Sequence, residues 1–458
     1  MRLLELILLL ACAAVSIRLA AVGRAAGITW IHAMQLLLAV ALIAQILLEG
    51  WRWQMFPAYA AAVLVATTPG LLGLGALATA CAAIATFGLL AASLVSCLAL
   101  PFVAPQKPHG PFAVGVTALP VNIQRPADAE PYEMKGVPQV RLWYPAQAPG
   151  WSSRFNTALA ERIANRFHAV PTLPATAAAP AAQAGKKFPV VIYFDGWPED
   201  KTQNVNLILE LASRGYAVAS VIYPGIDRPL GDYSSDAAFE HSVQLDHARV
   251  RLHARDAIAI LDELASLDAR TDSNFKQRLD SQHASTVGFS FGGAVAAEAT
   301  RLDPRIRAAV NLDGRHWGDA LEHGVAKPYL FICEELIVPT AADLASSDPA
   351  IRYEARMDRI DYSQLAANQQ ANGGIRVTIP GVAHMNFTDI ALRSPLRRFS
   401  FGGTIDAYRA QLIINTFVIE FLARYGGEAH GPLPAFDSAW PRFAEARLET
   451  WPAPTPRP

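Results

Sequence analysis

The sequence predicts an α/β domain, with a mostly parallel eight-stranded sheet covered by helices, that follows an N-terminal membrane-spanning helical region. Two observations support this prediction. Charged side chains are almost absent before Lys107 and frequent after it, and beyond that residue short β-rich runs alternate with helical patterns. A chain of 458 residues is also too long for one ordinary domain. The two parts are therefore expected to lie in different solvents.

The membrane region is predicted over residues 1–104, with three or four spans. Residues 3–23 and 28–48 are each long and apolar enough to cross a bilayer core of about 30 Å. The apolar stretch 56–100 is too long for one span and is expected to break at residues 67–70, so we favour four spans. Arg18 and Arg24 favour a cytoplasmic first loop, which with four spans puts the following domain outside the cytoplasm.

Composition also limits the partners and cofactors. A formal net charge of -1 without a basic block argues against a nucleic-acid partner. The chain lacks the Cys-x-x-Cys and His-Glu-x-x-His patterns of common metal sites, so no metal or other cofactor is expected. The bilayer itself is the expected partner, and nothing in the sequence indicates a protein partner.

A proline-rich connector, residues 101–112, leads into the domain predicted over residues 105–430, and residues 431–458 are expected to form a C-terminal tail. Helical patterns occupy residues 203–214, 247–267 and 405–425, whereas 171–183 is expected to be a flexible loop and 151–167 a further helix. The first two strands have no helix between them and should pair as an antiparallel edge. The predicted strands are residues 113–117, 140–144, 190–194, 217–222, 286–288, 308–312, 329–333 and 375–379.

A Gly-x-Ser-x-Gly turn joins one of these strands to an alanine-rich helix at Gly288-Phe289-Ser290-Phe291-Gly292. A strand, this turn and a helix form the nucleophile elbow of the α/β-hydrolase fold. The turn is so tight that side chains at Gly288 and Gly292 would collide, while Ser290 is held exposed at the tip. The sequence therefore predicts an α/β-hydrolase fold with Ser290 as the nucleophile.

A serine hydroxyl needs a general base and an acid that orients the base. His384 follows the last predicted strand, where this fold places the base. Asp313 ends the strand after the elbow and fits the chain order Ser, Asp, His. Glu334 and Glu335, at the end of the next strand, remain alternative acids at this stage.

An oxyanion hole needs two N–H groups. Phe291, directly after the nucleophile, is predicted to supply one of them. The second is expected from Trp197, in the turn after the strand at residues 190–194.

With these residues in place, the chain resembles the plasma platelet-activating factor acetylhydrolases and their bacterial relatives, which are grouped near dienelactone-hydrolase-like enzymes. The similarity covers about Gly110 to Tyr425. It rests on Gly110-Pro111-Phe112 leading to Leu142-Trp143-Tyr144-Pro145, on the elbow, on Leu312-Asp313, and on His384-Met385-Asn386-Phe387-Thr388-Asp389. The resemblance implies the triad Ser290, Asp313 and His384, favours Asp313 over the two glutamates, and suggests a bacterial inner-membrane protein.

The same resemblance implies calcium-independent hydrolysis of short or oxidised acyl esters of phospholipids through an acyl-enzyme. Two departures put the acyl preference in doubt, because the family has histidine where this chain has Asp195 and Phe289. Both side chains are expected to line or approach the acyl site. A general carboxylesterase or polyester or dienelactone hydrolase has the same triad, and a non-catalytic membrane binding protein on this fold is the alternative of another class.

Overall fold

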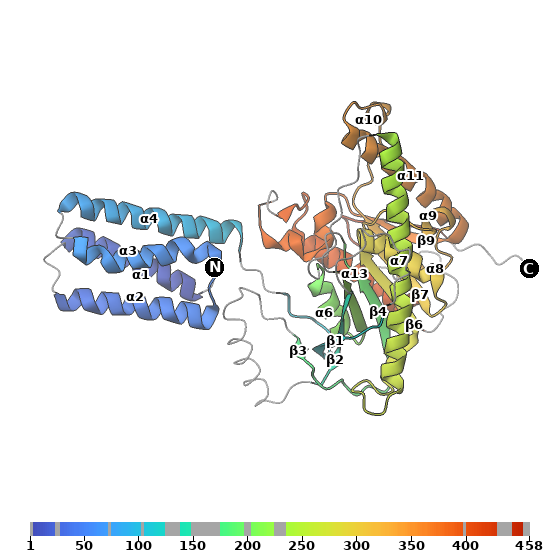
Figure 1. Ribbon diagram of the computed structural model, residues 1–458, viewed down its shortest axis with the longest axis horizontal. Helices are drawn as coiled ribbons and strands as arrows, with labels where there is room; N and C mark the ends of the chain where they lie inside the picture. The colour runs from blue at the N-terminus through green and yellow to red at the C-terminus, as the bar shows by residue number, and fades with distance from the viewer. Residues whose placement is uncertain are drawn as a thin grey trace, which may run out of the picture. The chain divides into compact units, whose positions relative to one another are not determined.

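The computed structural model describes residues 3–22, 28–71, 75–101, 105–123, 138–147, 175–196, 203–223, 235–396, 400–427 and 442–451. Contacts divide the chain into two compact units, of which the first contains the N-terminal helices and the second contains the sheet with its flanking helices (Figure 1). The helix predicted over residues 151–167 lies outside the described residues.

The first unit consists of apolar helices: α1 (Leu3–Val22), α2 (Ile28–Glu49), α3 (Phe56–Leu71) and α4 (Ala76–Ala99), with a 3₁₀ turn, η2 (Trp53–Met55), before α3. Their core contains Leu8 of α1, Leu38 of α2, Val65 of α3 and Leu90 of α4. At one end of the bundle the Arg52 guanidinium donates to the Glu5 carboxylate at 2.6 Å, and both side chains are buried. Pairing is what makes these charges tolerable in an apolar bundle.

Three of these helices, α1, α2 and α4, are long and apolar enough to cross a membrane. The sequence favoured four spans, but α3 has only 16 residues, or about 24 Å at about 1.5 Å per residue. The predicted break at residues 67–70 was also early, because α3 continues to Leu71. Pro69 lies in the last turn of α3, where its missing N–H costs only a single hydrogen bond.

The second unit is built on a mixed sheet whose described strands run in the order β10-β9-β8-β7-β6-β4-β5-β2-β1-β3. The strands from β5 through β4, β6, β7 and β8 to β9 are all parallel, and β1 and β2 pair antiparallel, as the sequence predicted. The bounds are β1 Ala113–Leu119, β2 Gln139–Ala146, β3 Thr176–Ala177, β4 Phe188–Phe194, β5 Ala217–Ile222, β6 Leu279–Phe289, β7 Ile306–Leu312, β8 Tyr329–Cys333, β9 Gly374–Thr378 and β10 Arg447–Trp451.

Helices cover both faces of this sheet, with α7 and α8 on one face and α6 and α13 on the other (Figure 1). The larger core lies under α7 and α8, where Val250, Leu264 and Val295 pack on Ile192 and Phe194 of β4. The helix bounds are α6 Val205–Ser213, α7 Asp236–Ala269, α8 Phe291–Leu302, α9 Ala320–His323, α10 Ala341–Leu344, α11 Pro349–Asn372 and α13 Ala407–Tyr425. The architecture is the α/β-hydrolase fold that the sequence predicted.

Two edge strands were not predicted. Residues 171–183 were expected to be a flexible loop, but β3 pairs with β1, and Ala181 forms a β-bridge to Ala146. Ala179 and Ala181 are buried because their small side chains fit the core, and the Tyr144 hydroxyl donates to the Ala179 carbonyl at 2.6 Å. At the opposite edge β10 pairs antiparallel with β9, so the sheet extends past residue 430, where the sequence analysis ended the domain.

Candidate active site

Ser290 occupies the turn between β6 and α8 with a left-handed backbone, φ 54°. A Cβ atom at Gly288 would lie 1.9 Å from the Gly292 carbonyl oxygen, and one at Gly292 would lie 2.2 Å from the Phe194 carbonyl oxygen. Glycine is therefore required at both positions, and the strained φ of Ser290 is the consequence of the tight turn. The Ser290 N–H donates to the Leu312 carbonyl at 2.9 Å, which ties the turn to β7.

Asp313 directly follows β7 and also has a left-handed backbone, φ 55°. Its N–H donates to the Ile332 carbonyl of β8 at 2.7 Å. The Asn311 amide holds the turn closed, since it accepts from the Gly314 N–H at 2.7 Å and donates to the Gly314 carbonyl at 3.0 Å. These bonds direct the Asp313 side chain toward the loop that follows β9.

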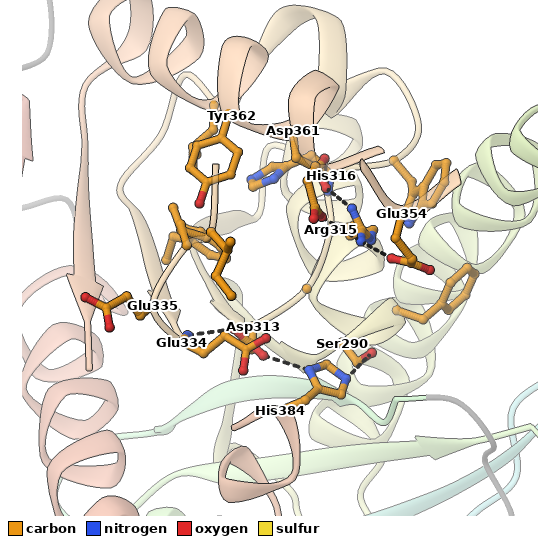
Figure 2. A pocket seen from close by; sticks show the side chains of 18 of the residues that line it. Ser290, Asp313, Arg315, His316, Glu334, Glu335, Glu354, Asp361, Tyr362 and His384 are labelled. Carbon is orange, nitrogen blue, oxygen red and sulfur yellow. Dashed lines mark hydrogen bonds and ion pairs between the residues drawn. The ribbon is translucent and has the colours of Figure 1, made fainter. Parts of the chain in front are cut away.

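His384 begins the 3₁₀ turn η5 (His384–Phe387) after β9. Its Nε2 atom lies 2.9 Å from Ser290 Oγ and its Nδ1 atom 2.7 Å from Asp313 Oδ2 (Figure 2). If Nδ1–H donates to the carboxylate, Nε2 is free to accept the serine proton. Asn386 fixes this loop, because its Oδ1 atom accepts from the Ala383 N–H at 2.9 Å and the Gly403 N–H at 2.7 Å. The structure thus brings together the three residues predicted as a triad.

The two alternative acids occupy different places. Glu335 points away from the imidazole and pairs with Arg447 at 3.1 Å. Glu334 lies beside Asp313 and donates its backbone N–H to Asp313 Oδ1 at 2.8 Å (Figure 2). The side-chain carboxylate that reaches the imidazole Nδ1 is therefore that of Asp313.

Of the two predicted oxyanion donors, Phe291 is the first residue of α8, so its N–H lies at the positive end of that helix. Trp197 lies outside the described residues. The neighbouring Gly196 is described, and a Cβ atom there would lie 3.0 Å from Ser290 Cβ. The turn after β4 therefore reaches the nucleophile.

The two positions that depart from the family differ in what they contact. The Phe289 ring lies 4.7 Å from the His384 ring, between centroids. Asp195 does not line the cavity as expected; its carboxyl is only 1% exposed and accepts from the Gln203 N–H at 2.8 Å. Burial raises the pKa of Asp195 to about 8. Asp195 is buried because the turn after β4 directs its side chain into the protein.

A cavity of about 720 Å³ opens beside Ser290 and His384. Arg315 lies in its wall and pairs with Glu354 at 2.5 Å, Asp358 at 2.8 Å and Asp361 at 3.1 Å (Figure 2). Burial raises the pKa of Asp361 to about 6. Among its described lining residues, Arg315 is the single Lys or Arg, against the carboxyl groups of Asp246, Asp313, Glu334, Glu335, Glu354, Asp358 and Asp361. The wall is therefore acidic.

Several residues that hold this site together were not predicted. Asn311 and Arg315 flank Asp313 without forming any motif, and the buried Tyr329 links Asn311 to His316 through hydrogen bonds of 3.0 and 2.8 Å. Burial lowers the pKa of His316 to about 4, so this imidazole is neutral at physiological pH. Among the described residues there is no group of three His, Cys, Asp or Glu side chains placed to hold a metal ion.

Comparison with known proteins found a family model and several relatives of the same name. The family model described as platelet-activating factor acetylhydrolase, isoform II, matches residues 258–430, a segment that contains Ser290, Asp313 and His384. The platelet-activating factor acetylhydrolase of Gallus gallus is 22% identical over 311 residues, covering 58% of this chain and 69% of that protein. The protein of the same name from Bos taurus is 23% identical over 368 residues, covering 70% of this chain and 76% of that protein.

Among solved structures, the ferulic acid esterase from Streptomyces cinnamoneus matches with a TM-score of 0.50 and 25% identity, covering 75% of this chain and 98% of that one. The chain is therefore similar to platelet-activating factor acetylhydrolases and has the fold of an esterase. These similarities identify it as a carboxylic ester hydrolase.

Proposed function

We propose that this chain hydrolyses carboxylic esters with Ser290 as nucleophile, His384 as general base and Asp313 as the acid that orients the base. The observation that carries the proposal is the continuous chain of contacts, 2.9 Å from Ser290 Oγ to His384 Nε2 and 2.7 Å from His384 Nδ1 to Asp313 Oδ2. These distances are within the range of a functional nucleophile, base and acid.

In the proposed reaction His384 Nε2 takes the Ser290 proton as Oγ attacks the ester carbonyl. The N–H groups of Phe291 and Trp197 stabilise the tetrahedral oxyanion. Collapse of this intermediate breaks the ester bond, and the alcohol leaves with the proton from His384. Water then attacks the acyl-enzyme with His384 again as base, which releases the carboxylic acid and restores Ser290.

The proposed substrates are short-chain or oxidised acyl esters of phospholipids. The curated relatives are named for the acetyl ester of platelet-activating factor, and the apolar N-terminal helices would keep the enzyme at a bilayer.

A second candidate is a neutral, non-phosphorylated ester. The acidic cavity wall favours this ester, since carboxylates repel a substrate phosphate. The matched ferulic acid esterase also has the same fold.

We also propose that the N-terminal helices anchor a multi-pass membrane protein with its α/β unit outside the cytoplasm. Arg18 and Arg24 favour a cytoplasmic loop after α1. If α3 crosses as well as α1, α2 and α4, the chain leaves the membrane on the opposite side from that loop. Local thinning of the bilayer accommodates a helix as short as α3.

The first test is turnover of p-nitrophenyl acetate, butyrate and octanoate, and of a short-chain phosphatidylcholine, by the wild type and Ser290→Ala. We expect the substitution to abolish turnover and labelling by a fluorophosphonate probe, because only the serine oxygen forms the acyl-enzyme. Phospholipid turnover would support the lipid substrate, and turnover of the p-nitrophenyl esters alone would favour the neutral ester. An inactive, unlabelled wild type would contradict the catalytic proposal and favour a binding protein on this fold.

A further inference from the structure

Glu334 contacts Asp313 and lines the same cavity as His384. It directly follows β8, and its backbone N–H donates to Asp313 Oδ1 at 2.8 Å. Asp313 Oδ2, the other oxygen, faces His384 Nδ1 at 2.7 Å. Because each carboxylate oxygen has its own donor, the Asp313 carboxylate has one orientation, and the Glu334 main chain sets it.

The Glu334 side chain adds its own carboxyl group to the same site. The same carboxyl group lies in the cavity wall, close to Asp313 and the imidazole (Figure 2).

The charges around this carboxyl group are mostly negative. Among the described residues, Asp313 from the end of β7 and Asp358 from α11 act on it with negative charge, and His384 with positive charge when protonated. The neighbouring titratable groups are Cys333 and Tyr362. Burial, followed by the charge of Asp313, raises the pKa of Glu334 to about 7, so the group changes charge near neutral pH.

We propose that Glu334 is a positioning residue of the active site, whose main chain orients Asp313 and whose ionised carboxylate stabilises the imidazolium that forms during the reaction. The inference rests on the proposed function and adds to it the regulation of the same site by pH. Full activity then requires the ionised carboxylate, and the rate falls as pH drops through about 7 and Glu334 is protonated.

Glu334→Gln and Glu334→Ala test this inference. Glutamine keeps the size and the hydrogen-bond acceptor but removes the charge. We expect the acidic limb of its kcat/KM profile for p-nitrophenyl acetate to move down by about 0.5–1 pH unit, because the variant has no carboxylate that is protonated near pH 7. The plateau kcat should fall about 3–10-fold, with KM nearly unchanged.

Alanine also removes the rest of the side chain from the cavity wall, so its kcat should fall further than that of Glu334→Gln, with the same shift of the acidic limb. The matched control is Glu420→Gln on α13, an exposed carboxylate outside the cavity, which should leave profile and kcat as in the wild type. Thermal unfolding checks that each variant folds. If Glu334→Ala does not fold, the near-isosteric glutamine variant decides the question.

A Glu334→Gln profile and kcat that match the wild type would overturn the inference while leaving the proposed function intact. A shift equally large in Glu420→Gln would also overturn it, since the effect would then be one of overall charge. If the wild type neither turns over esters nor labels with fluorophosphonate, both proposals are wrong.

Discussion

At the scale of single residues, the site depends on side chains that fix other side chains. Ser290, Asp313 and His384 could be predicted because each follows a strand, and glycines or chain order mark the position. The contacts of Asn311, Asn386 and Glu334 could not be predicted, because they join residues that are distant in sequence and form no local pattern. Only the folded sheet brings their partners within reach.

Asp195 makes a prediction about stability at this scale. Its buried carboxyl has a raised pKa of about 8, with an ordinary value of 3.8 when unfolded. Its contribution to stability is therefore fully present below about pH 4 and is lost as pH rises through about 8. We expect Asp195→Asn to melt about 2–5 °C higher than the wild type at pH 9 and to differ little at pH 5.

Thermal unfolding followed by circular dichroism at both pH values measures this difference. The exposed Asp272→Asn is the control, because its pairing with Arg270 lowers the pKa of this carboxylate, which therefore stays ionised at both pH values. Parallel melting curves for wild type and Asp195→Asn across this pH range would contradict the prediction.

At the scale of elements, the central strands other than β6 could be predicted to within two residues, because buried parallel strands are continuous runs of apolar residues. Strand β6 begins at Leu279, seven residues before the predicted start, because its first half is polar. The edge strands β3 and β10 were missed for opposite reasons. The segment containing β3 is rich in alanine and proline, and β10 is a polar, half-exposed strand whose sequence shows no strong apolar face. Pairing with a neighbour, rather than their own pattern, makes both of them strands.

Under the proposed membrane anchoring, whether α3 crosses decides on which side of the membrane the α/β unit lies. If this 16-residue helix crosses, a reporter fused after residue 105 should lie on the outer side, opposite the loop between α1 and α2. Paired fusions of alkaline phosphatase and a fluorescent protein after residues 52 and 105 measure this directly. We expect both sites to report the outer side, and a cytoplasmic signal at residue 105 would mean that α3 does not cross.

At the scale of the whole molecule, the distribution of charge says more about the substrate than the net charge does. The net charge of -1 gives no indication of an acidic cavity, because the carboxyl groups of its wall are far apart in the sequence, from Asp246 to Asp361. Composition therefore argued against a nucleic-acid partner, but it could not predict the charge of the substrate. That property arises only when α11 and the strand ends β6, β7 and β8 meet around one cavity.

The acidic wall should discriminate between esters by charge. We expect mono-p-nitrophenyl succinate, whose acyl chain ends in a carboxylate, to have a kcat/KM about 10-fold or more below that of p-nitrophenyl butyrate. Added salt should narrow the gap, since it screens the repulsion. Equal kcat/KM values at low ionic strength would show that the carboxyl groups around Arg315 do not act on the substrate.

The hydrogen bonds between parallel strands continue one residue beyond their ends, from Ser290 to Leu312, from Asp313 to Ile332 and from Ile379 to Cys333. Loops that carry function commonly open before the rest of a protein, because few such bonds hold them. Here Ser290 and Asp313, the proposed nucleophile and acid, form the last hydrogen bonds of the sheet. On heating, loss of their alignment should coincide with melting of the sheet itself, so the enzyme would stay active until it unfolds.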